Sequence, residues 1–297
     1  MTAFLKENGT LDIPKLHEAQ KLSVRAGIRM TLIDLEMPEW NKIHKRDRLT
    51  GCSLTGIQDA LAKFTNGERR EILTDLNHIA NEEAVFYAHA LRIPTPLLVT
   101  TVKPEGSLSI IAGGVSPGVH DSHAPYFIRR IRISANDALA KAAIVHGWNI
   151  SPENGTPDNK LENARIYVID FPNKSTAEKT KNDIGALEQL DRYLMFQESY
   201  TDHNTSNTIS VRPEEWQLVE DRIYLKWDKF IGVSFIAHDG GTYQLAPYEE
   251  IDEETYNKMK KNYMPFDPKI LELYETTGMS DLDSDDPDCA TGGCPTR

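Results

Sequence analysis

The stretch Leu97-Leu98-Val99-Thr100-Thr101-Val102, continued by Lys103-Pro104-Glu105-Gly106-Ser107-Leu108-Ser109, decides the fold of this chain. Its first part is a short β-branched run between two prolines, which is typical of a buried strand. A Pro-x-Gly-Ser turn then opens a helix. Such a turn leaves several backbone N–H groups unpaired and pointing outward, and this is how a helix start holds phosphate. On spacing alone, a plain connecting turn and a phosphate site are equally good interpretations.

Three side chains in this turn bear on the choice. The hydroxyls of Ser107 and Ser109 add donors for an anion, whereas the carboxylate of Glu105 favours a helix start but opposes a phosphate. The glycine-rich stretch 112–118 follows directly. The pattern matches neither the dinucleotide-binding fingerprint nor the P-loop.

Outward from this turn, periodic segments predict alternating helices and strands. The spacing of apolar residues predicts helices over 13–35, 56–64, 69–91, 136–146, 184–200 and 213–227. Short runs of β-branched and other apolar residues predict strands over 97–102, 127–133, 164–171, 208–211 and 232–236. Strands that alternate with helices indicate an α/β architecture with parallel pairing.

The composition of the chain excludes several classes of protein. Among 297 residues there are 33 Lys+Arg and 45 Asp+Glu, a formal net charge of −12, and only three cysteines. Three cysteines cannot build a disulfide framework, and the opening residues resemble no secretory leader, so we expect a cytoplasmic protein. No apolar run is long enough to cross a membrane. The acidic balance disfavours a nucleic-acid polymer as partner.

The last residues, 280–297, differ from the rest in composition. They hold five aspartates and the pair Cys289 and Cys294, and we expect them to form a mobile tail. Four residues, two of them glycine, separate the cysteines, so the pair can cycle between dithiol and disulfide. The alternatives are an accidental pair or half of a metal site, although the tail has no further Cys or His ligand.

Other candidate residues have weaker signals. His120 and His123 flank an aspartate, but without a third ligand they are better interpreted as surface or hydrogen-bonding residues, and no metal site is predicted. Arg129, Arg130 and Arg132 could steer a polyphosphate or lie along an exposed strand face. The loop 239–241 is compatible with ligand approach or with a hairpin turn, and Cys52 with a small packed residue.

Several of these motifs occur together, in order, along nearly the whole chain. They are Thr100–Pro104 with Gly106-Ser107, the loop from Ala112 to His120, Tyr126–Arg132, and Asp288-Cys289 to Cys294-Pro295, supported by 53–61, 239–247 and 251–256. In this order they resemble the adenosylcobalamin-dependent, class II ribonucleotide reductases. The monomeric ribonucleoside-triphosphate reductases are the most similar type.

The resemblance implies a fold and a reaction. It implies a ten-stranded α/β barrel in which a thiyl radical, generated with adenosylcobalamin, starts the reduction of a ribonucleotide to a 2′-deoxyribonucleotide, a step that supplies DNA replication. It implies that Pro104, Glu105, Gly106, Ser107 and Leu108 hold the substrate phosphates, although the family often has Ser where this chain has Glu105. It also implies that Cys289 and Cys294 are a redox-active disulfide shuttle, which thioredoxin re-reduces.

One family motif is missing from the sequence. The radical cysteine of these enzymes lies in an Asn-x-Cys-x-Glu setting, which does not occur here, and Cys52 does not match it. We therefore expect residues 1–279 to be the C-terminal part of the catalytic barrel and 280–297 a mobile redox tail. Such an oxidoreductase needs the N-terminal half of the reductase as partner. The alternatives are the C-terminal part of a class I large subunit, or a catalytically inert structural or binding remnant.

Overall fold

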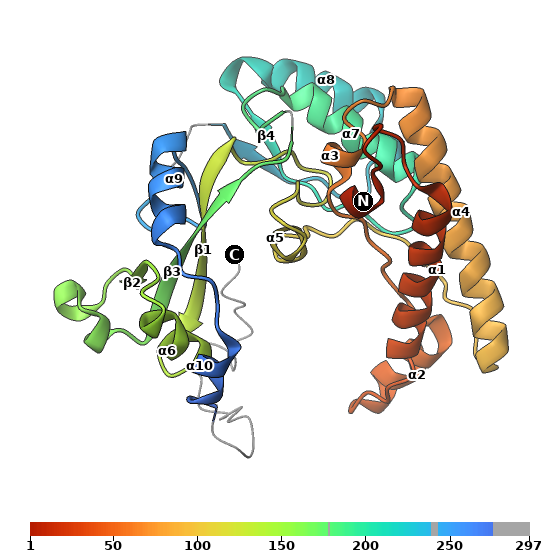
Figure 1. The fold of residues 1–297 in the computed structure, drawn as a ribbon. Helices are drawn as coiled ribbons and strands as arrows, with labels where there is room; N and C mark the ends of the chain where they lie inside the picture. Colours follow the sequence, from red (N-terminus) through yellow and green to blue (C-terminus); the bar gives the residue numbers. More distant parts are fainter. Residues whose placement is uncertain (178, 239–242, 276–297) are drawn as a thin grey trace. The chain divides into compact units, whose positions relative to one another are not determined.

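The computed structural model describes residues 1–177, 179–238 and 243–275 of the chain. These residues form two compact units, each built from two separate segments (Figure 1). The first unit comprises Met1–Pro125 and Ser175–Gly241, and the second comprises Tyr126–Lys174 and Thr242–Arg297. The tail 280–297, with Cys289 and Cys294, and the loop 239–241 lie outside the described residues.

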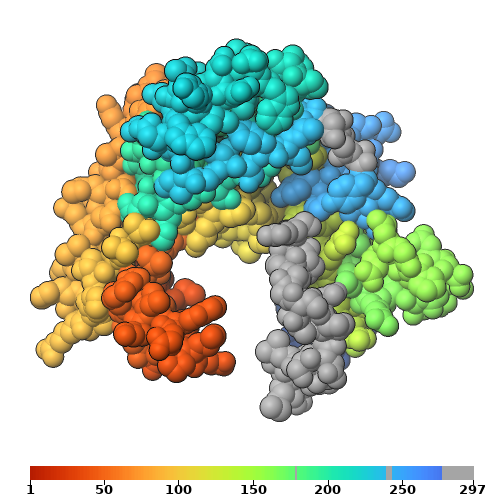
Figure 2. All heavy atoms as spheres, turned by 180° about the vertical axis from the view of Figure 1, so that it is seen from behind, coloured from red at the N-terminus to blue at the C-terminus, as the bar shows by residue number. Residues whose placement is uncertain are grey.

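The first unit is mainly helical. Its helices are α1 (Ile13–Met30), α2 (Pro38–Asp47), α3 (Ile57–Ala60), α4 (Asn66–Leu91), α5 (Leu108–Ile111), α7 (Ala186–Ser199) and α8 (Trp216–Leu225). The long helices α1 and α4 lie side by side (Figure 1). Residues of α7 and α8, blue-green in Figure 2, form an outer face of this unit. Among the described residues, no helix has the length and apolar composition needed to span a membrane.

The local sequence explains how α4, the longest of these helices, begins and what it buries. Thr65 accepts a hydrogen bond from the amide of Glu68, and the Glu68 carboxylate accepts one from the amide of Thr65, so a capping box starts α4. Its buried stripe, which includes Leu73, Leu76 and Ala80, packs into two hydrophobic clusters with α1 and α7. Helix α1 ends at Met30, five residues before the predicted end, and Pro38 begins a further helix instead of only ending the first one.

Parallel backbone pairing connects separate segments of the first unit. Thr100 forms a parallel bridge with Cys52, Val102 forms one with Thr205, and β4 (Ile209–Val211) pairs in parallel with β5 (Phe235–Ala237). The predicted α/β character and parallel pairing are thus confirmed in this unit. The predicted strand 97–102 consists only of these two bridges. The ten-stranded barrel stays a prediction.

The second unit is built on an antiparallel sheet, so the predicted parallel pairing is wrong there. Its strands β2 (Ile150–Pro152), β3 (Ile166–Lys174), β1 (Tyr126–Ser134) and β6 (Tyr248–Glu250) lie in the order β2-β3-β1-β6. Its helices are α6 (Ala138–Val145), α9 (Glu253–Asn262) and α10 (Pro268–Glu272), of which α9 contacts β1 and β3. Directly opposed pairs such as Arg130 and Asp170 fix the register of β1 on β3.

Candidate functional site

The predicted phosphate-binding turn lies in the first unit, between the bridged segment 97–102, which we call the central strand, and the short helix α5 (Figure 1). The amide of Lys103 donates to the hydroxyl of Ser53 at 2.9 Å, which fixes the start of the turn. The amide of Ser109 donates to the carbonyl of Glu105 at 2.9 Å, and the Ser109 hydroxyl to the carbonyl of Gly106 at 3.3 Å. The turn is therefore held at both ends.

The backbone amides inside this turn have no partner. The four consecutive N–H groups of Glu105, Gly106, Ser107 and Leu108 donate no hydrogen bond to any described residue. Ser107 and Leu108 are exposed, and Glu105 and Gly106 are half-buried. Consecutive amides that are free to point at one ligand form an anion-binding concavity. The turn therefore has unpaired donors available for an anion, and the role of residues 104–108 in substrate binding stays a prediction.

Glu105 has an unusual backbone conformation. Its φ is 56°, in the left-handed region that side chains other than Gly rarely adopt. Such a conformation costs of order 1–3 kcal/mol and persists only where neighbouring structure enforces it. The strain therefore lies within the run of free amides, where the chain would bind its ligand.

Lys103 places a positive charge at the start of the turn. An ideal Cβ on Gly51 would lie 3.2 Å from Lys103 Cε, so this side chain passes directly over Gly51. Beside it, Cys52 is buried, and its Sγ lies 3.1 Å from Ser23 Oγ. Burial raises the pKa of the Cys52 thiol above its usual value, although Ser23 and the Lys103 charge act in the opposite direction. This environment agrees with the interpretation of Cys52 as a packed residue.

The two histidines after the turn are half-buried, and His123 Nε2 lies 3.3 Å from Lys181 Nζ. Burial lowers the pKa of His120 to about 4, with a further contribution from the charge of Arg192. Burial and the Lys181 charge lower the pKa of His123 to about 4 as well. Between them, Asp121 forms a buried ion pair with Arg192. No group of three His, Cys, Asp or Glu side chains in the described ranges is arranged to hold a metal.

The three arginines of β1 lie in the second unit, where Arg132 is exposed and the other two make contacts within the sheet. Arg130 is buried and pairs with Asp170 at 2.9 Å and with Glu249 at 2.6 Å. The guanidinium of Arg129 lies 4.6 Å from the centroid of the Tyr248 ring. Both predicted roles, polyphosphate steering and an exposed strand face, are therefore wrong for Arg130, since its charge is used inside the sheet.

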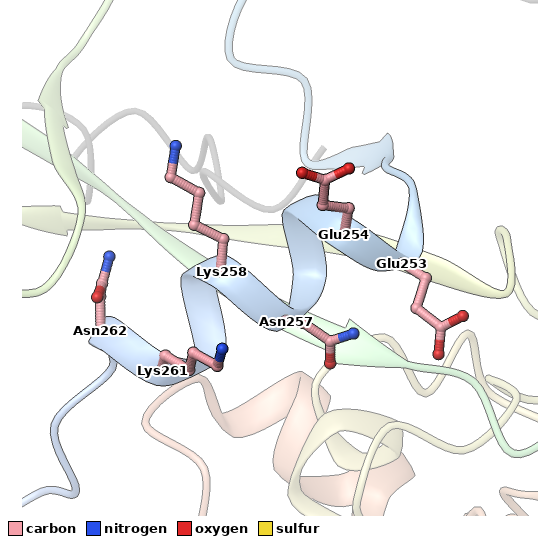
Figure 3. A pocket seen from close by; sticks show the side chains of 6 residues that line it. All are labelled: Glu253, Glu254, Asn257, Lys258, Lys261 and Asn262. Atoms are coloured by element: carbon pink, nitrogen blue, oxygen red, sulfur yellow. The ribbon is translucent and has the colours of Figure 1, made fainter.

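A pocket of about 700 Å³ also lies in the second unit, on helix α9 (Figure 3). Its lining residues come from this one helix: Glu253, Glu254, Asn257, Lys258, Lys261 and Asn262. The two carboxylates lie at the start of the helix and the two ammonium groups towards its end, so the lining carries both signs of charge and selects neither anions nor cations. The pocket contains none of the predicted site residues.

Sequence reasoning missed the residues that hold the central strand in place. Asp202 accepts hydrogen bonds from the amides of Val99 at 3.0 Å and Thr100 at 3.1 Å, and from the side chains of Asn77 and Asn81. Its partners lie more than a hundred residues away in the sequence. Only the position of Asp202, just after the end of α7, marks it as a residue that could bond the backbone.

Three curated proteins similar to this chain carry closely similar names. A protein of Dictyostelium discoideum, named a probable adenosylcobalamin-dependent ribonucleoside-triphosphate reductase, is 31% identical over 244 residues, 80% of this chain and 31% of that protein. The enzyme of that name from Levilactobacillus brevis is 26% identical over 95% of this chain and 41% of its own length. A putative one from Mycobacterium phage D29 is 26% identical over all of this chain and 43% of its own.

Solved structures show the same relationship at the level of the fold. A crystal structure of a B12-dependent, class II ribonucleotide reductase superposes with a TM-score of 0.73 at 22% identity, over 89% of this chain and 40% of that one. A scan against protein-family models finds no match.

The sequence relationship identifies this chain as a homologue of the ribonucleotide reductases. Among them, it is related to the class II enzymes named adenosylcobalamin-dependent ribonucleoside-triphosphate reductases, and the predicted resemblance is confirmed. The chain spans between a third and a half of the length of most of these curated relatives.

Proposed function

We propose that this chain is the C-terminal part of an adenosylcobalamin-dependent ribonucleotide reductase and works together with the N-terminal part that carries the radical cysteine. The observation that carries the proposal is the run of four unpaired amides from Glu105 to Leu108 at the end of the central strand. Amides in this arrangement hold the phosphate oxygens of a nucleotide through charge-assisted hydrogen bonds. The names of the relatives support a ribonucleoside triphosphate as the substrate.

In our proposal, this chain takes part in substrate binding through residues 104–108, and the pocket on α9 is not the cofactor site. The pocket on α9 is lined by four charged side chains and two asparagines, with no apolar side chain for a corrin ring, and it does not fit adenosylcobalamin.

The second contribution of the chain is electron supply through Cys289 and Cys294, which lie outside the described residues. Each reduction of a ribonucleotide consumes two electrons and two protons and leaves one disulfide in the active site. In our proposal, one tail thiolate attacks that disulfide to form a mixed disulfide. The second tail thiolate then resolves it, restores the active-site dithiol and leaves a tail disulfide. Thioredoxin, by the same exchange, returns the tail to the dithiol.

The shuttle is tested by replacing both tail cysteines. The variant Cys289→Ser/Cys294→Ser, combined with the N-terminal part, adenosylcobalamin and a ribonucleoside triphosphate, should lose multiple turnover driven by thioredoxin. It should keep the single turnover that the active-site dithiol supports. The buried Cys52→Ser variant is the matched control and should turn over normally with thioredoxin. Unimpaired thioredoxin-driven turnover of the double variant contradicts the shuttle.

A further inference from the structure

A second loop, Gly114 to Gly118, supports the phosphate-binding turn. The amides of Gly114 and Val115 donate to the carbonyl of Ser109 at 3.0 and 3.2 Å. At Gly118, whose φ is +52°, an ideal Cβ would lie 2.6 Å from the carbonyl oxygen of Lys103. The backbone of Gly118 thus packs directly on the chain that enters the turn, at a distance that leaves no room for a side chain.

The carboxylate of Asp59 fixes this supporting loop. Its Oδ2 accepts from the amide of Ser116 at 2.8 Å and also from the Ser116 hydroxyl, and its Oδ1 accepts from the Thr176 hydroxyl at 2.5 Å. The carbonyl of Ser116 accepts in turn from the amide of Gly56 at 2.9 Å. Ser116 is 1% exposed, so a buried residue connects the loop to the start of α3.

We propose that Asp59 is a positioning residue for the phosphate-binding turn, an inference that rests on the proposed function. Asp59 acts through the 114–118 loop, which donates two hydrogen bonds to the carbonyl of Ser109 and packs on Lys103 at Gly118, on either side of the amides of 105–108. The turn needs such support because its inner amides are unpaired and Glu105 is held at a positive φ. Without the carboxylate, the buried amide of Ser116 loses its acceptor, and the loop relaxes away from Lys103.

The test is the affinity of the chain for inorganic tripolyphosphate, measured by isothermal titration calorimetry. The Asp59→Asn variant has one acceptor oxygen where three donors converge, and we expect its affinity to fall about tenfold, the effect of one lost hydrogen bond to a charged group. The matched control is Asp183→Asn. Asp183 accepts from the amide of Thr180 at 2.7 Å and from its hydroxyl at 2.8 Å, the same bonding pattern in a loop outside the network. Its affinity should equal that of the wild type.

The possible results separate this inference from the proposed function. Wild-type affinity in Asp59→Asn, or equal losses in both variants, overturns the positioning role and leaves the phosphate site standing. If the wild-type chain does not bind tripolyphosphate, the phosphate site and the positioning role both fail.

If circular dichroism shows that Asp59→Asn is unfolded, a milder variant still tests the inference. A kinetic measurement adds a second test. Ser116→Ala keeps the amide bond to Asp59 and loses only the hydroxyl bond, so its affinity should fall about two- to threefold. Unchanged affinity in this variant overturns the inference. In the complemented enzyme, Asp59→Asn should raise KM for the ribonucleotide with little change in kcat, because it alters binding of the phosphates and not the reacting atoms. A fall in kcat alone contradicts a positioning role.

Discussion

Arg130 on β1 and Asp170 on β3 are directly opposed across the antiparallel ladder, and Arg130 Nε lies 2.9 Å from Asp170 Oδ1. Both side chains are less than a tenth exposed. The side-chain amide of Asn149 donates to the second carboxylate oxygen of Asp170 at 2.6 Å. Arg130 also donates to the carbonyl of Ala246 at 3.0 Å. This network joins four segments of the second unit, and the charges of Arg130 and Asp170 are paired with each other within the sheet.

Replacing Arg130 should therefore destabilise the second unit strongly. Arg130→Ala leaves Asp170 buried without its cation, and we expect the free energy of unfolding to fall by about 3–5 kcal/mol. Arg132→Ala, on the same strand but exposed, is the control and should change it by less than about 0.5 kcal/mol. Urea denaturation of both variants measures the difference. Equal, small effects would show that the buried pair does not stabilise the sheet.

Asp202 should stabilise the central strand of the first unit. Burial alone would raise the pKa of its carboxyl, but hydrogen bonds from Asn77 and from the amides of Val99 and Thr100 outweigh it and lower the pKa. We expect Asp202→Asn to reduce the free energy of unfolding by about 2–3 kcal/mol at pH 7. Asp221→Asn, exposed on α8, should be neutral.

The pH dependence of the Asp202 effect has a definite sign. Because its pKa is lowered in the folded state, the stabilisation is complete above the pKa of the unfolded carboxyl and is lost as the pH falls through the folded value. The difference between wild type and Asp202→Asn in urea denaturation should therefore shrink between pH 5 and pH 3. A difference that is constant over this range is incompatible with an ionised, hydrogen-bonded Asp202.

His120 should make the first unit sensitive to mild acid. Its pKa of about 4 lies below the ordinary histidine value of 6.5, so between these values the unfolded chain binds more protons than the folded one. Stability should fall as the pH is lowered from 7 to 5, by about 2 kcal/mol for this residue. His120→Gln should remove that part of the loss, whereas His78→Gln, exposed on α4, should keep it. The same loss in both variants would assign it to other groups.

The close packing of Gly118 on Lys103 predicts that alanine substitutions at Gly118 and Gly113 differ in their effect on stability. Gly118→Ala places a Cβ 2.6 Å from a backbone oxygen, whereas Gly113, with a φ of +94°, has nothing within 4 Å of its ideal Cβ. Both substitutions carry the cost of a positive φ, about 1 kcal/mol, and only Gly118→Ala adds an overlap. We expect Gly118→Ala to be the less stable variant by about 1–3 kcal/mol in thermal unfolding. Equal melting temperatures would contradict the close packing of this loop.

Local signals predicted the helices better than the sheets. Helix α4 is close to its predicted range because its helix signals depend only on residues close together in the sequence. These signals are the capping box and the lack of Pro or Gly after the first turn. Helix α2 was missed because Pro38 serves both as the end of one helical pattern and as the first residue of another. The pairing of β1 with β3 depends on contacts such as Arg130 with Asp170, forty residues apart, which no local pattern reveals.

The candidate site was predictable only in part for the same reason. The sequence pattern located the turn at 104–108, and the structure gives it the unpaired amides that the pattern indicated. Ser53 and Asp59, which hold the turn and its supporting loop, are about fifty residues from their partners in the sequence. Their roles depend on how the first unit folds.

The formation of 2′-deoxyribonucleotide by the complemented enzyme tests the central claim most directly. This chain is combined with a polypeptide that supplies the N-terminal part of a class II reductase, together with a ribonucleoside triphosphate, adenosylcobalamin and thioredoxin with its reductant. We predict deoxyribonucleotide only when both polypeptides and adenosylcobalamin are present. Lack of product from a mixture in which the two polypeptides are shown to associate, or product formation without adenosylcobalamin, would contradict the proposed function.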